Sequence, residues 1–383
     1  MSEGVALYDL SPAVRLMLMG TVLALGPLAW VWVRNRNTPA GRRLAALTAL
    51  TLFLTFDLVL FGAFTRLTDS GLGCPDWPGC YGNASPSGAH AEISQAQAAM
   101  PTGPVTHAKA WIEMVHRYLA TGVGVLILTL FAATWWQRRR HTLPVSLWWP
   151  AATLAWVCVQ GGFGALTVTM KLFPAIVTLH LLGGLVLLAL LCRQAVAYRH
   201  AQSGQGPVDV PSDVRAWLAL AFALLWLQVA LGGWVSTNYA VLACSDFPTC
   251  QGRWWPEMDL RQGFEVWRGL GLTAGGEPIT FAALTAIHYV HRLVAYVLLA
   301  ALGVLAWRLH GAGLLRQQAL WIAALALWQL ASGLSNVVLG WPMAAALAHT
   351  GGAAALVVVL TWTLCEAASL RTARVPQGQG ARA

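Results

Sequence analysis

Charged residues are scarce in this sequence. Asp, Glu, Lys and Arg make up only 10% of its 383 residues, whereas hydrophobic residues make up 57%. A soluble domain is usually about one-quarter charged. The chain therefore lacks the polar residues that a water-facing surface requires, which excludes an ordinary soluble globular protein.

Long apolar runs are present instead. Crossing the hydrocarbon core of a bilayer takes roughly 20 apolar residues in a helix. The sequence contains nine such stretches, at 14–33, 44–64, 111–135, 146–168, 174–192, 216–235, 281–306, 318–339 and 343–365. The first is too long for a cleavable signal, and no small-residue cleavage site follows it before Arg34. We expect an all-α integral membrane protein with nine transmembrane helices.

The distribution of basic residues predicts the orientation. Basic residues in short loops are retained on the cytoplasmic side. Alternate connections between the spans lie on opposite sides of the membrane, and one of these two sets holds most of the Lys and Arg residues. This places the N-terminus outside and the C-terminus in the cytoplasm. The net charge of +9 reflects this retention pattern, so we do not interpret it as a nucleic-acid surface.

The chain contains an internal repeat. Residues 61–74 (FGAFTRLTDSGLGC) resemble residues 231–244 (LGGWVSTNYAVLAC), and IEMVHR at 112–117 resembles IHYVHR at 287–292. The unit is four helices, so both copies enter the membrane in the same direction and form two parallel four-helix bundles related by an axis along the membrane normal. The predicted organisation is an extra N-terminal helix and cytoplasmic loop (1–43), an N-terminal bundle (44–192), a cytoplasmic linker (193–215), a C-terminal bundle (216–366) and a cytoplasmic tail (367–383).

Four intramembrane histidines recur at matched places in the two halves: His116, His180, His291 and His349. An ionisable side chain at membrane depth is costly and is functional by default. The alternative is a neutral histidine bonded to a neighbouring helix, which the recurrence disfavours. Each pair lies on alternate helices, which can face each other across a bundle. Two such imidazoles suit a heme iron, whereas zinc usually takes three or four close ligands.

All four histidines lie nearer the outer ends of their helices. Both heme sites should therefore lie side by side in the outer half of the membrane. A conduit that carries electrons across the membrane would need one site in each half, so this placement favours chemistry or docking at one surface.

Three arginines near these histidines are candidates for binding heme propionates. Arg117 and Arg292 each follow a ligand histidine, and Arg66 ends a predicted span at the outer face. A guanidinium pairs with a carboxylate through two hydrogen bonds. For Arg66, snorkelling to the interface is an equally good explanation.

The repeat is asymmetric three residues before each HR histidine, where the first half has Glu113 and the second has His288. Residues at i and i+3 share a helix face, so Glu113 should reach the same interior as His116 and could exchange protons with a substrate. A structural hydrogen bond is the alternative. We infer that the first half is catalytic and the second holds a permanent heme. Asp57, whose counterpart is Leu227, could relay protons or make a polar contact.

Two pairs of cysteines lie in the long outer loops, in the segments CPDWPGC (74–80) and CSDFPTC (244–250). The periplasm is oxidising, so disulfides Cys74–Cys80 and Cys244–Cys250 are the leading interpretation. A redox-active role for the first pair stays open, because exposed disulfides in short loops are often labile.

These motifs together resemble one family. The stretch GAFTRLTDSGLGCPDWPGCYG, the IEMVHRY and IHYVHRL helices, and the LHLLGG and LAHTGG helices are similar to those of heme A synthase, an enzyme of cytochrome oxidase assembly. The resemblance covers about residues 44–366. It implies oxidation of the C8 methyl of heme O to a formyl group through hydroxylated intermediates. The extra helix at 14–33 departs from the usual eight-helix plan.

The resemblance also implies roles for individual residues. His116 and His180 would flank the substrate heme O, with Glu113 assisting its oxidation, and His291 and His349 would bind heme b. Cys74 and Cys80 match the bacterial branch that has a loop disulfide.

The implied partners are heme O, heme A and membrane lipid. Further hypotheses are heme O synthase, assembly factors of cytochrome oxidase subunit I and a second copy of this chain. The functional alternative is a two-heme b-type membrane electron carrier, which would not need the acid Glu113. A heme transporter is disfavoured by the parallel repeat and the fixed ligand pairs.

Overall fold

The computed structural model describes residues 11–140, 145–204 and 206–368. Within them, nine helices are long and apolar enough to cross a membrane, as predicted. They are α1 (Ser11–Arg34), α2 (Ala40–Leu67), α4 (His107–Arg139), α5 (Trp148–Thr169), α6 (Pro174–Ser203), α7 (Ser212–Thr237), α9 (Phe281–Gly311), α10 (Arg316–Val338) and α11 (Met343–Glu366). Shorter elements are α3 (His90–Ala99), the 3₁₀ turn η1 (Ala240–Leu242), α8 (Leu260–Gly263), and the strands β1 (Val208–Asp209) and β2 (Ala367–Ala368).

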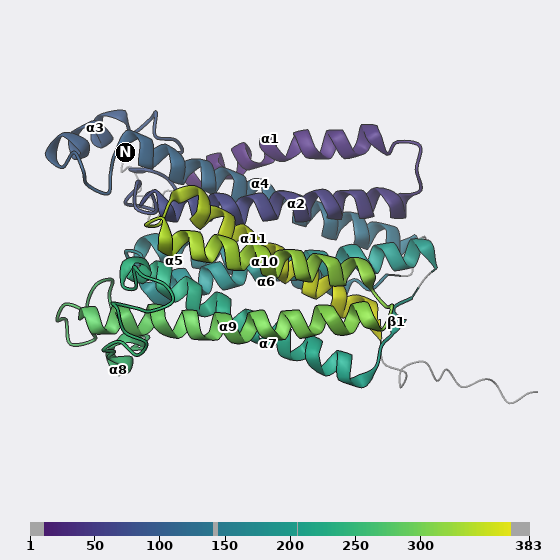
Figure 1. Cartoon of the computed structure of the whole chain (residues 1–383). Helices are drawn as coiled ribbons and strands as arrows, with labels where there is room; N and C mark the ends of the chain where they lie inside the picture. The colour runs from purple at the N-terminus through teal and green to yellow at the C-terminus, as the bar shows by residue number, and fades with distance from the viewer. Residues whose placement is uncertain (1–10, 141–144, 205, 369–383) are drawn as a thin grey trace, which may run out of the picture.

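The long helices form two four-helix bundles of the same plan. In the first, α4 and α6 each pack against both α2 and α5, so α4 and α6 lie on a diagonal. In the second, α9 and α11 each pack against both α7 and α10 and form the equivalent diagonal. The segments 68–106 and 238–280 lie at the same end of the molecule, which we call the loop end (Figure 1). The two parallel repeats are therefore confirmed.

Local sequence explains where the helices of the diagonals begin. The hydroxyls of Thr106 and Thr280 cap α4 and α9 by accepting hydrogen bonds from Lys109 N–H and Ala283 N–H, a favoured arrangement at a helix N-terminus. Pro174 occupies the first turn of α6, where its missing N–H costs nothing. These starts place all four matched histidines in the part of each helix nearest the loop end.

The bundles contact each other through α2, α6, α7 and α11. Leucines from both halves, among them Leu188, Leu225, Leu302 and Leu360, share one buried core. At the end opposite the loops, Glu366 of α11 pairs with Arg199 of α6, and β1 pairs with β2 in parallel. The two halves therefore form one continuous packed unit.

The predicted linker at 193–215 is shorter in the structure. Residues 193–203 continue α6, because no proline or glycine interrupts them before Gly204. Gly204 then takes a φ of 67° and ends the helix, a conformation that glycine adopts without steric cost. The predicted parts at 1–10 and beyond 368 lie outside the described residues.

Helix α1 is the extra element and packs along α4 (Figure 1). Gly20 permits close approach, since a Cβ there would lie 2.5 Å from the Thr121 methyl group. Away from this contact, α1 exposes large apolar side chains such as Trp30 and Trp32, which suit lipid. Near the loop end, Leu16 packs into the same cluster as Cys74 and Cys80. Helix α1 therefore supports the outer side of α4 and the first cysteine loop.

Candidate functional site

The four matched histidines lie on the two diagonals. His116 on α4 is paired across the first bundle with His180 on α6, and His291 on α9 with His349 on α11. All four histidines are half-buried. The helices thus position two histidines per bundle, as the sequence predicted.

Each histidine ring packs against a glycine of an adjacent helix. A Cβ built on Gly62, Gly232 or Gly333 would lie 3.1 Å from Cε1 of His116, His291 or His349, respectively. The fourth contact, from Gly164 to Cε1 of His180, would be 3.5 Å. Sequence reasoning missed these glycines, because only the fold shows which helix lies opposite each histidine. Because glycine has no side chain, each histidine ring can lie against the backbone of the neighbouring helix.

Adding a methyl group at these glycines should displace the rings. Because interiors are close-packed, we expect Gly62→Ala to weaken heme binding in the first bundle and Gly333→Ala to weaken it in the second, each by roughly the 10-fold typical of disturbed ligand orientation. The measurement is heme content per purified protein. Gly124→Ala on α4 and Gly303→Ala on α9 are matched controls, because a Cβ at either position meets nothing within 4 Å. Equal losses in the controls would contradict this role.

The histidines of the second half have polar partners. The Ser332 hydroxyl lies 3.0 Å from Nδ1 of His349. The Gln228 amide nitrogen lies 3.0 Å from Nδ1 of His291, 3.3 Å from its Nε2 and 3.1 Å from its backbone oxygen. Sequence reasoning also missed both residues.

The arginines that follow the HR histidines bind the cysteine loops. Arg117 Nη1 donates to the backbone oxygens of Asp76, Pro78 and Gly79 at 3.0, 3.2 and 2.5 Å. Arg292 Nη1 donates to the equivalent oxygens of Asp246 and Thr249 at 3.0 and 2.7 Å. Both arginines are buried. They therefore fasten each loop to its histidine helix, a role that the sequence did not reveal.

The cysteine loops have the same internal structure. Disulfides Cys74–Cys80 and Cys244–Cys250 are both formed, with Cα atoms 4.9 and 4.8 Å apart. In each loop an aspartate, Asp76 or Asp246, accepts hydrogen bonds from two backbone N–H groups that follow the second cysteine. Hydrogen bonds from the Thr249 hydroxyl and from these N–H groups hold the pKa of Asp246 below its ordinary value. The disulfide and the aspartate contacts thus fix the shape of each loop at the loop end.

Glu113 and His288 occupy equivalent places but have different partners. The Glu113 carboxylate is buried, pairs with Arg117 and accepts a hydrogen bond from the Cys74 N–H at 2.8 Å. His288 is also buried, and its Nδ1 lies 3.0 Å from the backbone oxygen of Ala240. A buried carboxylate therefore stands one turn from the histidine of the first half, at its contact with the disulfide loop.

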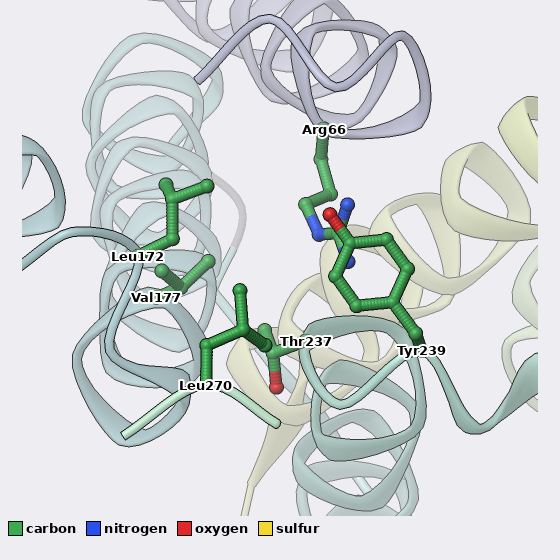
Figure 2. A pocket seen from close by; sticks show the side chains of 6 residues that line it. All are labelled: Arg66, Leu172, Val177, Thr237, Tyr239 and Leu270. Carbon is green, nitrogen blue, oxygen red and sulfur yellow. The ribbon is translucent and has the colours of Figure 1, made fainter. Parts of the chain in front are cut away.

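Arg66 lies at the loop end, where the two halves meet. It pairs with Asp69 at 3.1 Å, donates to the backbone oxygen of Ser236 at 2.6 Å and lies over the Tyr239 ring at 4.0 Å. Figure 2 shows the recess beside Arg66 and Tyr239. It is lined by Arg66, Leu172, Val177, Thr237, Tyr239 and Leu270. Arg66 thus joins the halves, and its propionate role stays a prediction, as do those of Arg117 and Arg292.

Asp57 lies midway along α2 with its side chain exposed. Its position at membrane depth makes it an unusual residue. The relay and the polar-contact interpretations both stay predictions.

The donor set suits an iron porphyrin. Among the residues that the structure describes, no three His, Cys, Asp or Glu side chains lie close enough to hold a metal ion by themselves. A histidine pair would hold the iron of a porphyrin, whose own nitrogens would complete its coordination. A Cβ at the glycine that faces each ring would come within 3.1 to 3.5 Å of it, so the glycines leave room for the imidazoles. The residues present therefore fit a heme in each bundle.

Comparison with known proteins identifies the family of this chain. The COX15-CtaA family model, described as cytochrome oxidase assembly protein, matches residues 45–361. The chain is 36% identical to a heme A synthase of Shewanella oneidensis over 318 residues, which cover 83% of this chain and 94% of the relative. It is 26% identical to a heme A synthase of Halalkalibacterium halodurans over 332 residues, covering 85% and 95% of the two chains. With a heme A synthase of Caulobacter vibrioides the identity is 29% over 339 residues, covering 80% and 91%.

Proposed function

Since the chain belongs to the COX15-CtaA family of cytochrome oxidase assembly proteins, we propose that it is a heme A synthase, which oxidises the C8 methyl of heme O to the formyl group of heme A. The observation that carries this proposal is the pair of matched histidine sites, of which only one has a buried acid beside it. A membrane enzyme suits a substrate that dissolves poorly in water.

The first bundle is the proposed substrate site. His116 and His180 hold heme O from the two sides of the diagonal, and Glu113 takes up protons that the oxidation releases. Arg117 orients Glu113 and fixes the loop between Cys74 and Cys80 above it. General acid–base catalysis of this kind typically contributes 10²–10⁴-fold to a rate, which makes Glu113 the proposed catalytic residue.

The second bundle is the proposed heme b site. His291 and His349 would bind its iron, and heme b supplies a one-electron redox centre when bound there. His288 takes the place of the acid and bonds to the Ala240 backbone, so this half has a structural contact where the first half has a proton acceptor. Arg66, Arg117 and Arg292 are the proposed propionate partners at the loop end.

The proposed location is the bacterial inner membrane, with the loop end and the N-terminus in the periplasm and the C-terminus in the cytoplasm. The disulfides of both loops suit an oxidising compartment. Heme O synthase, assembly factors of cytochrome oxidase subunit I and a second copy of the chain remain proposed partners.

Expression in a host that makes heme O but no heme A tests the proposal. We expect heme A in the extracted pigments only when this chain is present, as measured by chromatography. The alternative function, a b-type electron carrier, predicts heme B alone, two bis-histidine spectra and no new pigment. That result would overturn the proposal.

A further inference from the structure

The two histidine pairs differ in what their Nδ1 atoms contact. In the second half, Ser332 Oγ donates to the backbone oxygen of Trp328 at 2.7 Å and lies 3.0 Å from Nδ1 of His349. A hydroxyl has a single hydrogen, so this oxygen can only accept from His349. The proton of His349 is therefore on Nδ1, which leaves the Nε2 lone pair available to a metal.

His291 has a different partner in Gln228. The Gln228 amide nitrogen stands 3.0 Å from Nδ1 of His291 and donates to the His291 backbone oxygen at 3.1 Å. A carbonyl oxygen only accepts, so this contact keeps the amide nitrogen, which is a donor, beside the ring. Of these two residues, only Ser332 therefore offers an acceptor to Nδ1 of a histidine.

The first half lacks these partners. Nδ1 of His116 and Nδ1 of His180 are buried, and no group of the described residues lies within hydrogen-bond distance of either atom. The ring-packing glycines give the register: Ser332 precedes Gly333 as Phe163 precedes Gly164, and Gln228 precedes Gly232 by the same step as Leu58 precedes Gly62. Neither Phe163 nor Leu58 has a side-chain hydrogen-bond acceptor.

Such second contacts decide how firmly a histidine holds a metal. A hydrogen bond from Nδ1–H fixes the ring orientation and raises the basicity of the ligand, and its loss typically costs 10- to 100-fold in metal affinity. A resident heme needs firm ligands, whereas a heme that is substrate and then product must leave after each turnover. Ser332 in the second half offers this contact to His349. Its counterpart in the first half, Phe163, offers none to His180.

We propose that Ser332 is a positioning residue that retains heme b through His349, and that Phe163 keeps His180 a weak ligand so that the product heme is released. This inference rests on the proposed division of the halves into a substrate site and a heme b site.

The first test removes the second-half contact. We expect Ser332→Ala in the full-length protein to lower heme b retention by about 10-fold. Its heme b midpoint potential should also rise, because a less basic imidazole stabilises ferric iron less. Ser332→Thr keeps the hydroxyl and should restore both values. Unchanged retention and potential in Ser332→Ala, or a Thr variant that behaves like Ala, would overturn the proposal.

The second test adds the contact to the first half. Phe163→Ser and Phe163→Ala open similar space, but only serine offers an acceptor to His180. We expect Phe163→Ser to co-purify with more heme O and heme A than Phe163→Ala, and to release added heme O about 10-fold more slowly. Equal release from both variants would refute the first-half part of the inference.

These tests are independent of turnover. Heme retention, release and potential are measured on purified protein, whereas heme A formation is measured in the host. A wild type that holds heme b but forms no heme A would refute the proposed function and leave the role of Ser332 testable.

Discussion

Replacing Glu113 with glutamine is expected to lower heme A formation by at least about 100-fold, the lower end of what a general acid or base contributes, while heme b content stays unchanged. Glutamine has the same size, and its Oε1 can still accept the hydrogen bond that the Cys74 N–H donates at 2.8 Å. It cannot take up or release a proton. The measurement is heme A per cell in a host that supplies heme O, with heme b content as the marker of folding.

Comparing Glu113→Gln with Glu113→Asp separates chemistry from structure. Aspartate keeps an ionisable group but is too short to reach both Arg117 and the Cys74 N–H in the same way. If Glu113 acts by proton transfer, aspartate should retain more activity than glutamine. If Glu113 only ties α4 to the loop, glutamine should retain more, because it is long enough to keep the Cys74 N–H contact, although its amide group cannot accept from Arg117 as well. A Gln variant with more than about a tenth of wild-type activity would refute the catalytic role.

The membrane fold is readable from the sequence for a physical reason. Each span must satisfy its own backbone hydrogen bonds in lipid, so length and hydropathy alone determine where helices lie. The repeat of IEMVHR and IHYVHR then places His116 and His291 on equivalent helices. The match between helix positions follows from local sequence, whereas the pairing of the histidines as ligands stays a prediction.

The contacts of the site depend on residues that are distant in sequence. Arg117 and Arg292 are predicted to bind propionates, and the structure shows in addition that their guanidinium groups donate to loop carbonyls near each disulfide. Ser332 and Gln228 appear in the sequence as ordinary polar residues of apolar helices. Their relation to His349 and His291 depends on how neighbouring helices are rotated. Hydropathy does not encode that rotation, so the second contacts could not be predicted.

The same limit applies to the ends of elements. The linker was expected to begin at residue 193, where the apolar run stops, but α6 continues to Ser203. Arg, Gln and Ala are good helix formers, and a helix that leaves the membrane need not end at its boundary. Hydropathy measures where lipid ends, whereas Gly204 determines where the helix ends.

Removing one histidine from each pair is expected to separate the two sites. His349→Ala should abolish bound heme b, because the iron would lose one of its two histidine ligands. The variant would also lose the ring that packs against Gly333. His180→Ala should keep heme b and lose heme O binding and heme A formation. The measurements are the pigments extracted from purified protein and the optical spectrum of the heme that remains.

His288→Ala provides the matched control for this pair of variants. His288 is a buried histidine of α9, one turn from His291, and it contacts the backbone oxygen of Ala240. If heme b is held by His291 and His349, the control should retain it, since losing one neutral hydrogen bond costs only about 1 kcal/mol. Loss of heme b from His180→Ala, with retention in His349→Ala, would reverse the assignment of the halves. It would also leave Glu113 beside the resident heme, where a proton acceptor has no substrate to serve.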